Sequence, residues 1–404
     1  MDTGQKRKLV EHAIEQGNGI LRLSPAWVAR NFLASGRRMG LPETAYDVGP
    51  RGTLAERWLA ATNQADNEIS VEDEGLAYID MDGQKTITLK EAVESNGAAI
   101  MGREYARTHE GLGRLAKIFD YADRLPYHVH QMKKDADRVG RKPKEEAYYF
   151  PEGVDMGIHP ETFFGVHPWI ADQKQYDVLL PYLVEWNSDR ILKHSRAYLQ
   201  IAGEGFHLPA GYLHAPGSAL TIELQEDSDV FAHLQALVGG KIISKELLFK
   251  DVHPDDRVRY GEAAVLRQID WEGCGDPYFY ENHHLEPQPI PETQQAGGEE
   301  SWIFYNTTKF SGKRLVVKPG MTYTSLDRGV YNILVWQGQG LYDGHAVQAG
   351  QFDLETCQDE LLITHAKATT PIPIQNTGST DLVVLKFFGP DVNPDVPRIP
   401  VYRA

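Results

Sequence analysis

The sequence is poor in cysteine, with only Cys274 and Cys357 among 404 residues. Two cysteines are too few for a disulfide framework, which favours a reducing compartment, and inert packing is the simplest role for both. The stretch from Met1 to Gly19 is charged and lacks the apolar core of a signal peptide, and no apolar run reaches the roughly 18 residues that a membrane helix needs. We therefore expect a cytoplasmic protein without a membrane partner.

The chain also has too little positive charge for a nucleic-acid or anionic-membrane partner. It carries 41 Lys and Arg against 57 Asp and Glu, a formal net charge of -16. Partners of that kind need clustered cations. The length is too great for one ordinary core and predicts two domains, or one large elongated β protein, and we expect a monomer or a homodimer.

Helix patterns occur near the N-terminus and again around residues 159–195. The helical spacing of apolar residues in Gln5–Gln16 predicts an N-terminal helix. A second helix is predicted over Pro25–Ser35, with Ser24 as its N-cap and Pro25 at its first position. Asp82-Gly83 predicts a hairpin turn, with a helix from Leu89. Further helices are expected as an insertion near residues 159–195, at Pro160–Thr162 and Val178–Trp186.

The second half shows short strand-like runs separated by regular glycine turns. Such strands predict an antiparallel sandwich or jelly roll. The run EPQPIPETQQAGG at residues 286–298 is the predicted linker. We therefore predict a first domain at 1–285 and a second at 299–404. The second lacks an H-x-H pattern and is expected to hold no metal.

Two distant segments together carry the ligand types of one metal site. In the first, His128 and His130 are two residues apart, so a strand directs both side chains to one face. His214 follows a P-x-G turn much later in the chain. A carboxylate from Glu145 or Glu146 would complete the set, and alternation alone does not decide between the two. Imidazole and carboxylate donors suit Zn²⁺, Fe²⁺ or Mn²⁺.

Four segments, in order, resemble motifs of class I mannose-6-phosphate isomerases, which belong to the cupin superfamily. In that family a stretch L-S-x-Q-V-H-P is followed by G-K-T-E-x-W-Y, I-P-x-G-x-x-H-A and E-x-Q-x-S-D-x-T-Y-R. The corresponding segments here are Gly113–Gln131, Pro143–Tyr149, Leu208–Ala215 and Glu223–His233. The resemblance implies a mainly β fold with two cupin-type jelly-roll barrels (a bicupin), N-terminal helices and a helical insertion in the first domain.

The resemblance also implies roles for individual residues. It selects Glu146 as the carboxylate ligand, with His130 and His214, and puts His128 where the family has a ligating glutamine. Zinc is the first expectation for the divalent metal, with iron, manganese, nickel or cobalt as alternatives. The remaining assignments are Lys144 for substrate binding, and Glu223 and His233 for catalysis. For Glu223 an orienting role toward a metal-bound imidazole is equally open.

The sequence departs from the family at two points near the substrate. Pro126 replaces the serine of L-S-x-Q-V-H-P, and His233 aligns with the arginine of T-Y-R if one extra residue is allowed before Ser228. The expected function is a metal-dependent aldose–ketose isomerase that acts through a cis-enediolate on a mannose- or fructose-type sugar or sugar phosphate. Two alternatives remain. His128 in place of glutamine gives the donor set of iron or manganese cupin oxygenases, and the lost arginine fits a catalytically lapsed sugar-binding protein.

Overall fold

The computed structural model describes residues 1–403, which form two compact units. Unit 1 comprises Met1–Val28, Glu56–Ile118 and Glu286–Arg398. Unit 2 comprises Ala29–Ala55, Phe119–Leu285 and the C-terminal residues from Ile399. The predicted domains were continuous stretches at 1–285 and 299–404, and these limits stay a prediction. Every predicted site residue lies in unit 2.

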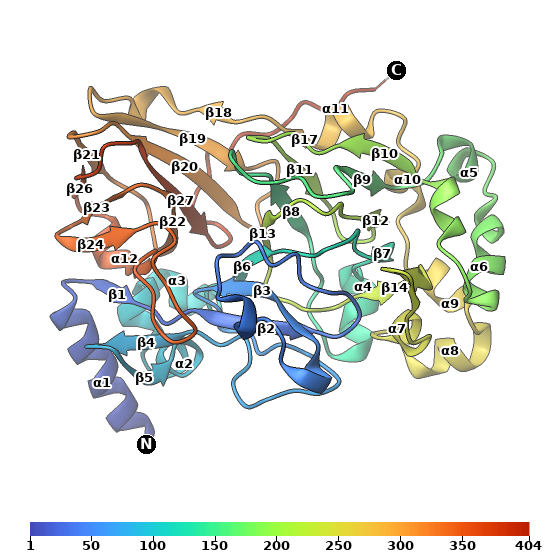
Figure 1. Cartoon of the computed structure of the whole chain (residues 1–404), viewed down its shortest axis with the longest axis horizontal. Coiled ribbons are helices and arrows are strands. Elements are labelled where there is room, and N and C mark those ends of the chain that lie inside the picture. The colour runs from blue at the N-terminus through green and yellow to red at the C-terminus, as the bar shows by residue number, and fades with distance from the viewer. Residues whose placement is uncertain (404) are drawn as a thin grey trace. The chain divides into compact units, whose positions relative to one another are not determined.

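Unit 1 contains two antiparallel sheets that enclose an apolar core (Figure 1). Side chains such as Leu315 and Val384 of one sheet pack with Tyr323 and Ile374 of the other. The larger sheet has the order β1-β25-β22-β27-β20-β19-β18, with bounds Ile20–Arg22, Glu360–Ile363, Tyr331–Gln337, Leu382–Phe388, Ser311–Val317, Gly298–Phe304 and Gln288–Pro289. The smaller has the order β21-β26-β23-β24, with bounds Thr322–Ser325, Ile372–Asn376, Gln339–Tyr342 and His345–Gln348.

The N-terminal helix and hairpin of unit 1 match their predictions. Helix α1 spans Thr3–Gln16 and begins with a capping box in which Asp2 accepts from the backbone of Gln5. The hairpin pairs β4 (Tyr78–Met81) with β5 (Gln84–Thr88). The other helical segments of this unit are α2 (Leu89–Met101), α3 (Arg103–Thr108), η6 (Pro291–Thr293) and α12 (His365–Ala368).

Unit 2 is built on two antiparallel arrays of strands. One array has the order β10-β9-β12-β7-β14, with bounds Arg196–Leu199, Glu161–Phe164, His214–Ala215, His128–Val129 and Ala232–His233. The other contains β17-β11-β8-β13, with bounds His284–Leu285, Gly205–Leu208, Glu146–Tyr149 and Thr221–Glu226. A small hairpin joins β15 (Leu237–Val238) to β16 (Lys241–Ile242).

Helices of unit 2 pack on the first array and share its apolar core (Figure 1). Ile170, Leu183 and Val265 from three of these helices cluster with Val129 of β7. The helical segments are η1 (Glu43–Ala45), η2 (Gly49–Arg51), α4 (Lys133–Ala136), η3 (Asp137–Val139), α5 (Pro168–Asp172), η4 (Tyr176–Leu179), α6 (Leu180–Glu185), η5 (Arg190–His194), α7 (Glu246–Phe249), α8 (Pro254–Tyr260), α9 (Ala263–Leu266), α10 (Trp271–Cys274) and α11 (Phe279–His283).

Two predicted helices are wrong. Within Pro25–Ser35 the chain forms the strand β2 (Ala26–Arg30), and the predicted helix at Pro160–Thr162 gives way to β9. Buried strands and buried helices share an apolar composition, so short segments of this kind are ambiguous in sequence. The helical insertion itself begins later, at Pro168.

The remaining strands are β3 (Thr53–Leu59) and β6 (Arg114–Phe119). The mainly β, antiparallel fold expected from the sequence is confirmed. Among residues 1–403, no helix has both the length and the apolar character required to cross a bilayer.

Candidate metal centre

The strand register of unit 2 gathers histidines on one face of the first array. His128 lies opposite His214 of β12 on one side and opposite His233 of β14 on the other. Directly opposed residues of an antiparallel pair project to the same face. Phe164 also lies opposite His214, and its ring approaches that of Phe206 in the second array with a centroid distance of 4.9 Å. The histidine face therefore points toward the second array.

The second array contributes acidic and phenolic side chains to the same space. Glu146 and Tyr148 are two residues apart on β8 and so share a face. Glu223 of β13 lies opposite Tyr148 in the register. All three side chains are buried. The site thus draws on segments far apart in sequence that pair only in the folded unit.

His128, His130 and His214 form a compact buried group. One ring nitrogen of each lies within 4.8 Å of those of the other two. The Nδ1 atoms point outward and donate to backbone carbonyl oxygens, in His128 to Pro126 (2.7 Å), in His130 to Val230 (2.6 Å) and in His214 to Tyr212 (2.8 Å). Because a carbonyl oxygen can only accept, each Nδ1 carries a proton, and a neutral ring then presents its Nε2 lone pair inward.

Glu146 closes this group from the opposite array. Its Oε2 lies 3.0 Å from Nε2 of His130, and its Oε1 lies 3.0 Å from Nε2 of His214. The hydroxyl of Tyr148 donates to Oε1, and the ammonium of Lys144 lies 2.9 Å from Oε2. The carboxylate is therefore held at a fixed position beside the imidazoles.

The hydrogen bonds at this centre are incomplete in a way that fits a cation. Among residues 1–403, Nε2 of His130 and Nε2 of His214 are buried without a hydrogen-bond partner. Because Nδ1 carries the proton, the Nε2 atoms of His130 and His214 have lone pairs, and each lies 3.0 Å from a negatively charged oxygen of Glu146. These contacts are repulsive unless a positive charge lies between the atoms. Three imidazole nitrogens and one carboxylate oxygen are a donor set that suits a divalent transition-metal ion. The residues present fit such an ion.

The protonation states also favour metal binding. Burial, followed by the charge of Lys144, lowers the pKa of His130 to about 3, and burial together with the neighbouring histidines lowers the pKa of His128 well below its usual value. Burial opposes ionisation of Glu146, but Lys144 and the adjacent imidazoles hold its pKa well below the usual range. Neutral imidazoles and an ionised carboxylate are the forms that bind metals.

Lys144 bridges the candidate ligand Glu146 and the predicted catalytic residue Glu223. Its Nζ lies 2.9 Å from Oε2 of Glu146 and 3.1 Å from Oε1 of Glu223. Burial by itself lowers the pKa of Lys144, but the two carboxylates raise it overall, so the side chain is a buried ammonium ion. The sequence assigned Lys144 to a substrate oxygen or anion, whereas the described contacts pair it with these carboxylates.

His233 lies beside the histidine group and outside it. Its ring centroid is 5.8 Å from that of His128, and the ring stacks on Phe231 and meets the edge of Phe32. Burial and the charges of Lys250 and Arg30 lower its pKa well below the usual value. The ring is therefore neutral, and its catalytic role stays a prediction.

Glu145, the residue that alternation could not separate from Glu146, faces the other way. Its Oε1 lies 2.8 Å from Nε2 of His207 on β11. The register pairs His207 with Ala147, which lies between Glu146 and Tyr148 and therefore faces away from the histidine group. Glu145 and His207 are on this same outer face. The geometry brings Glu146, and not Glu145, to the three imidazoles.

Sequence reasoning missed two kinds of contributor to the centre. The first is Tyr148, whose hydroxyl donates to Glu146. Tyr148 is two residues after Glu146 in a strand, so the sequence already indicated that the two side chains share a face. The second is the set of carbonyl acceptors at Pro126, Val230 and Tyr212. These are backbone groups, so no residue type in the sequence marks them.

Comparison with known proteins finds likeness in structure. No protein-family model and no curated protein matches the sequence. Mannose 6-phosphate isomerase from Bacillus subtilis is similar, with a TM-score of 0.60 and 16% identity over 91% of this chain and 99% of that one. A phosphomannose isomerase variant from Salmonella typhimurium gives a TM-score of 0.57 and 12% identity over 92% and 100%.

A zinc-bound mannose 6-phosphate isomerase is also similar, with a TM-score of 0.58 and 12% identity over 92% of this chain and 100% of that one. At such identities the likeness concerns the fold. The resemblance that the sequence motifs predicted is confirmed at that level.

Proposed function

We propose that this protein is a metal-dependent sugar isomerase that interconverts an aldose and a ketose of the mannose and fructose type, free or phosphorylated. The observation that carries the proposal is the buried group of three imidazoles and Glu146, set beside Lys144 and Glu223. Support also comes from the likeness in fold to mannose 6-phosphate isomerases over nearly their whole length.

His128, His130, His214 and Glu146 are the proposed metal ligands. Zinc is the first candidate because one similar isomerase is described as zinc bound, and iron, manganese, nickel or cobalt suit the same donors. When bound, a divalent cation supplies positive charge that stabilises negative charge developing on the sugar oxygens. The outward hydrogen bonds from the three Nδ1 atoms keep each ring oriented for this task.

The proton transfer is assigned to Glu223. Isomerisation moves one proton between the two carbons that exchange the carbonyl group, and a second proton from the hydroxyl oxygen of one carbon to the carbonyl oxygen of the other. Glu223 takes the proton from the carbon beside the carbonyl and returns it to the neighbouring carbon, so the carboxylate is regenerated. Lys144, 3.1 Å from Oε1, holds this carboxylate in position, and its ammonium can also donate to a sugar oxygen. His233 remains the second candidate for proton transfer, from the strand beside His128.

The test is the aldose-to-ketose ratio, followed by NMR. Metal-loaded protein is incubated with mannose, fructose and glucose and with their 6-phosphates. Turnover is expected for at least one pair, and Glu223→Gln is expected to lower it by about 10²- to 10⁴-fold, the usual contribution of a general acid or base. Glu145→Gln removes a carboxylate from the opposite face and is expected to keep the activity.

An unchanged ratio for every sugar would remove the isomerase proposal. If those sugars nevertheless raised the melting temperature, the lapsed sugar-binding alternative would be supported, because a ligand that binds only the folded state stabilises it.

A second candidate is an iron or manganese oxygenase. Its supporting observation is His128, which completes a set of three imidazoles where the isomerase motif has a glutamine. This candidate predicts bound iron or manganese and substrate-dependent oxygen uptake. Bound zinc without oxygen uptake would eliminate it.

A further inference from the structure

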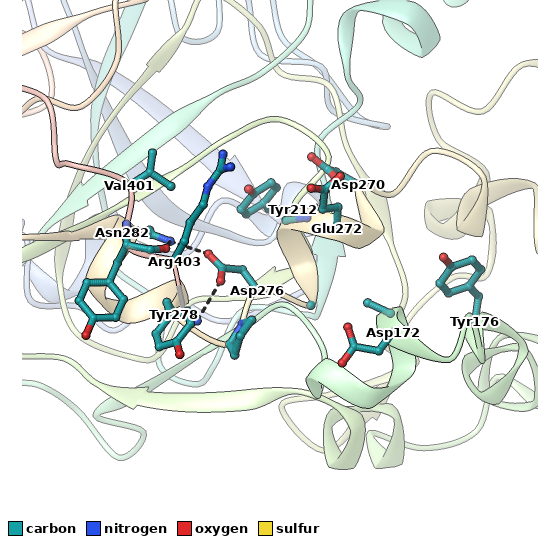
Figure 2. Close-up of a pocket in the computed structure, with 15 residues that line it drawn as sticks. Asp172, Tyr176, Tyr212, Asp270, Glu272, Asp276, Tyr278, Asn282, Val401 and Arg403 are labelled. Atoms are coloured by element: carbon teal, nitrogen blue, oxygen red, sulfur yellow. Dashed lines mark hydrogen bonds between the residues drawn. The ribbon is translucent and has the colours of Figure 1, made fainter.

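Unit 2 has a second feature that the proposed isomerase function does not use. It is a pocket of about 760 Å³ formed by the end of α5, the segment around α10 and the C-terminal residues (Figure 2). We call it the acidic pocket. Its wall carries four carboxylates and a single cationic side chain, those of Asp172, Asp270, Glu272, Asp276 and Arg403. The charged groups of the wall therefore sum to three negative charges.

The carboxylates of the acidic pocket differ in how far their charge is already satisfied. Asp276 accepts from the Asn282 side chain at 2.7 Å, drawn in Figure 2, and Asp270 accepts from the backbone of Gly273 at 3.1 Å. The side chains of Asp172 and Glu272 have no hydrogen bond or ion pair within the described part of the chain and are exposed. These two are available to a positively charged ligand.

A buried phenol gives an independent sign that the acidic pocket holds a ligand. Tyr212 is only 9% exposed, it lines the pocket, and its hydroxyl makes no hydrogen bond to any group of residues 1–403. The hydroxyl end of Tyr212 packs against Gly273. Any side chain at position 273 would collide with it, because a Cβ there would lie 2.1 Å from the hydroxyl oxygen. The hydroxyl oxygen itself stays accessible from the pocket, where it can accept a hydrogen bond from a ligand that carries donors.

Aromatic rings complete the wall. Tyr176 stacks on Trp271 with centroids 4.3 Å apart, and Tyr278 lies 4.8 Å from Tyr402. Tyrosine faces attract ammonium groups, and carboxylates attract them more strongly. An alkylammonium group donates to phenol and carboxylate oxygens alike. Neutral sugars and bare divalent ions each match only part of this chemistry.

From these observations we infer that the acidic pocket binds a small organic cation with primary ammonium groups. Polyamines and amino sugars both carry this group. The site is separate from the metal centre and does not depend on the isomerase function. It is joined to that centre by one backbone contact, because the carbonyl of Tyr212 accepts from Nδ1 of His214.

Isothermal titration calorimetry at constant ionic strength tests the inference on the full chain. Spermidine and glucosamine serve as probes, and their relative affinity separates the two sources. At least one is expected to bind with 1:1 stoichiometry. The variant D172N/E272Q is expected to weaken that binding by about tenfold or more, because two of the unpaired charges are lost.

A charge-matched control separates this site from general attraction to an acidic surface. D177N/E185Q also removes two exposed carboxylates of unit 2, outside the pocket wall, and is expected to change affinity less than about twofold. Tyr212→Phe is expected to weaken binding and leave the melting temperature of the ligand-free protein unchanged.

The inference is overturned if neither ammonium probe binds, or if glucose or Mg²⁺ binds the pocket as tightly as the ammonium probes. Equal loss of affinity in both double variants would also overturn it, because the attraction would then belong to the whole surface.

Discussion

The substitution Glu146→Gln should leave the metal-free protein at least as stable as the wild type and make the metal-loaded protein less stable than the wild type. In the metal-free wild type, Lys144, Glu146 and Glu223 together carry one net negative charge in a buried space, and Glu146 faces imidazole lone pairs at 3.0 Å. Glutamine removes the net charge, keeps the Lys144–Glu223 pair and donates an N–H to an imidazole. Metal-free E146Q should therefore be at least as stable as the metal-free wild type.

Metal should change this order. A free metal concentration of 100 times the Kd stabilises the folded state by about 2.7 kcal/mol. With the usual unfolding entropy per residue, this raises the melting temperature by about 3 °C if the whole chain unfolds together, and by about 6 °C if unit 2 unfolds alone. E146Q lacks the carboxylate ligand and should show little of this rise.

The assay is thermal unfolding followed by circular dichroism, after chelation and after addition of Zn²⁺ or Mn²⁺. Glu145→Gln is the matched control, since its side chain faces His207 and not the histidine group. It should keep the full metal-induced rise. The reasoning is refuted if E146Q shows the same rise as the wild type, or if metal-free E146Q is less stable than the metal-free wild type by several degrees.

Three further predictions concern buried groups. Lys144→Met leaves two buried carboxylates without their cation and should lower the free energy of unfolding by about 3–5 kcal/mol, measured in urea; a loss below about 1 kcal/mol would contradict the buried pairing. His128→Gln should retain metal by elemental analysis, because the amide oxygen is also a neutral donor, whereas His130→Ala should lose it. Burial raises the pKa of Glu360 to about 7 against 4.5 for an exposed glutamate, so its protonation should stabilise the fold as the pH falls from about 7 to about 4.5. Glu360→Gln should lack this component of the pH dependence.

The sequence predicted the side chains of the candidate centre better than it predicted the local structure around them. Alternation placed His128 and His130 on one face, and in the structure β7 carries His128 while His130 follows directly after that strand. It could not separate Glu145 from Glu146, because which face of β8 meets the histidines depends on pairing with β11 and β13, far away in the chain. That choice came from the motif resemblance.

The wrong helices have a similar origin. Pro25 after Ser24 is a sound helix start in isolation, yet Val28, Ala29 and Arg30 are all buried, and a strand forms there. At Glu161–Phe164 the competing partners are β10 and β12, both more than 30 residues downstream. Local signals give way to pairing with other strands, which β9 makes on both edges and β2 on one.

Pro126 shows why a departure from the family motif need not disturb metal binding. Its side chain replaces a serine of the resembling isomerases and offers no hydroxyl. The contact that the centre uses is its carbonyl oxygen, which accepts from Nδ1 of His128 at 2.7 Å. A carbonyl is supplied by any residue, so the tautomer of His128 is fixed whatever side chain stands at 126. The orientation of the imidazole therefore depends on the backbone at position 126 and not on its side chain.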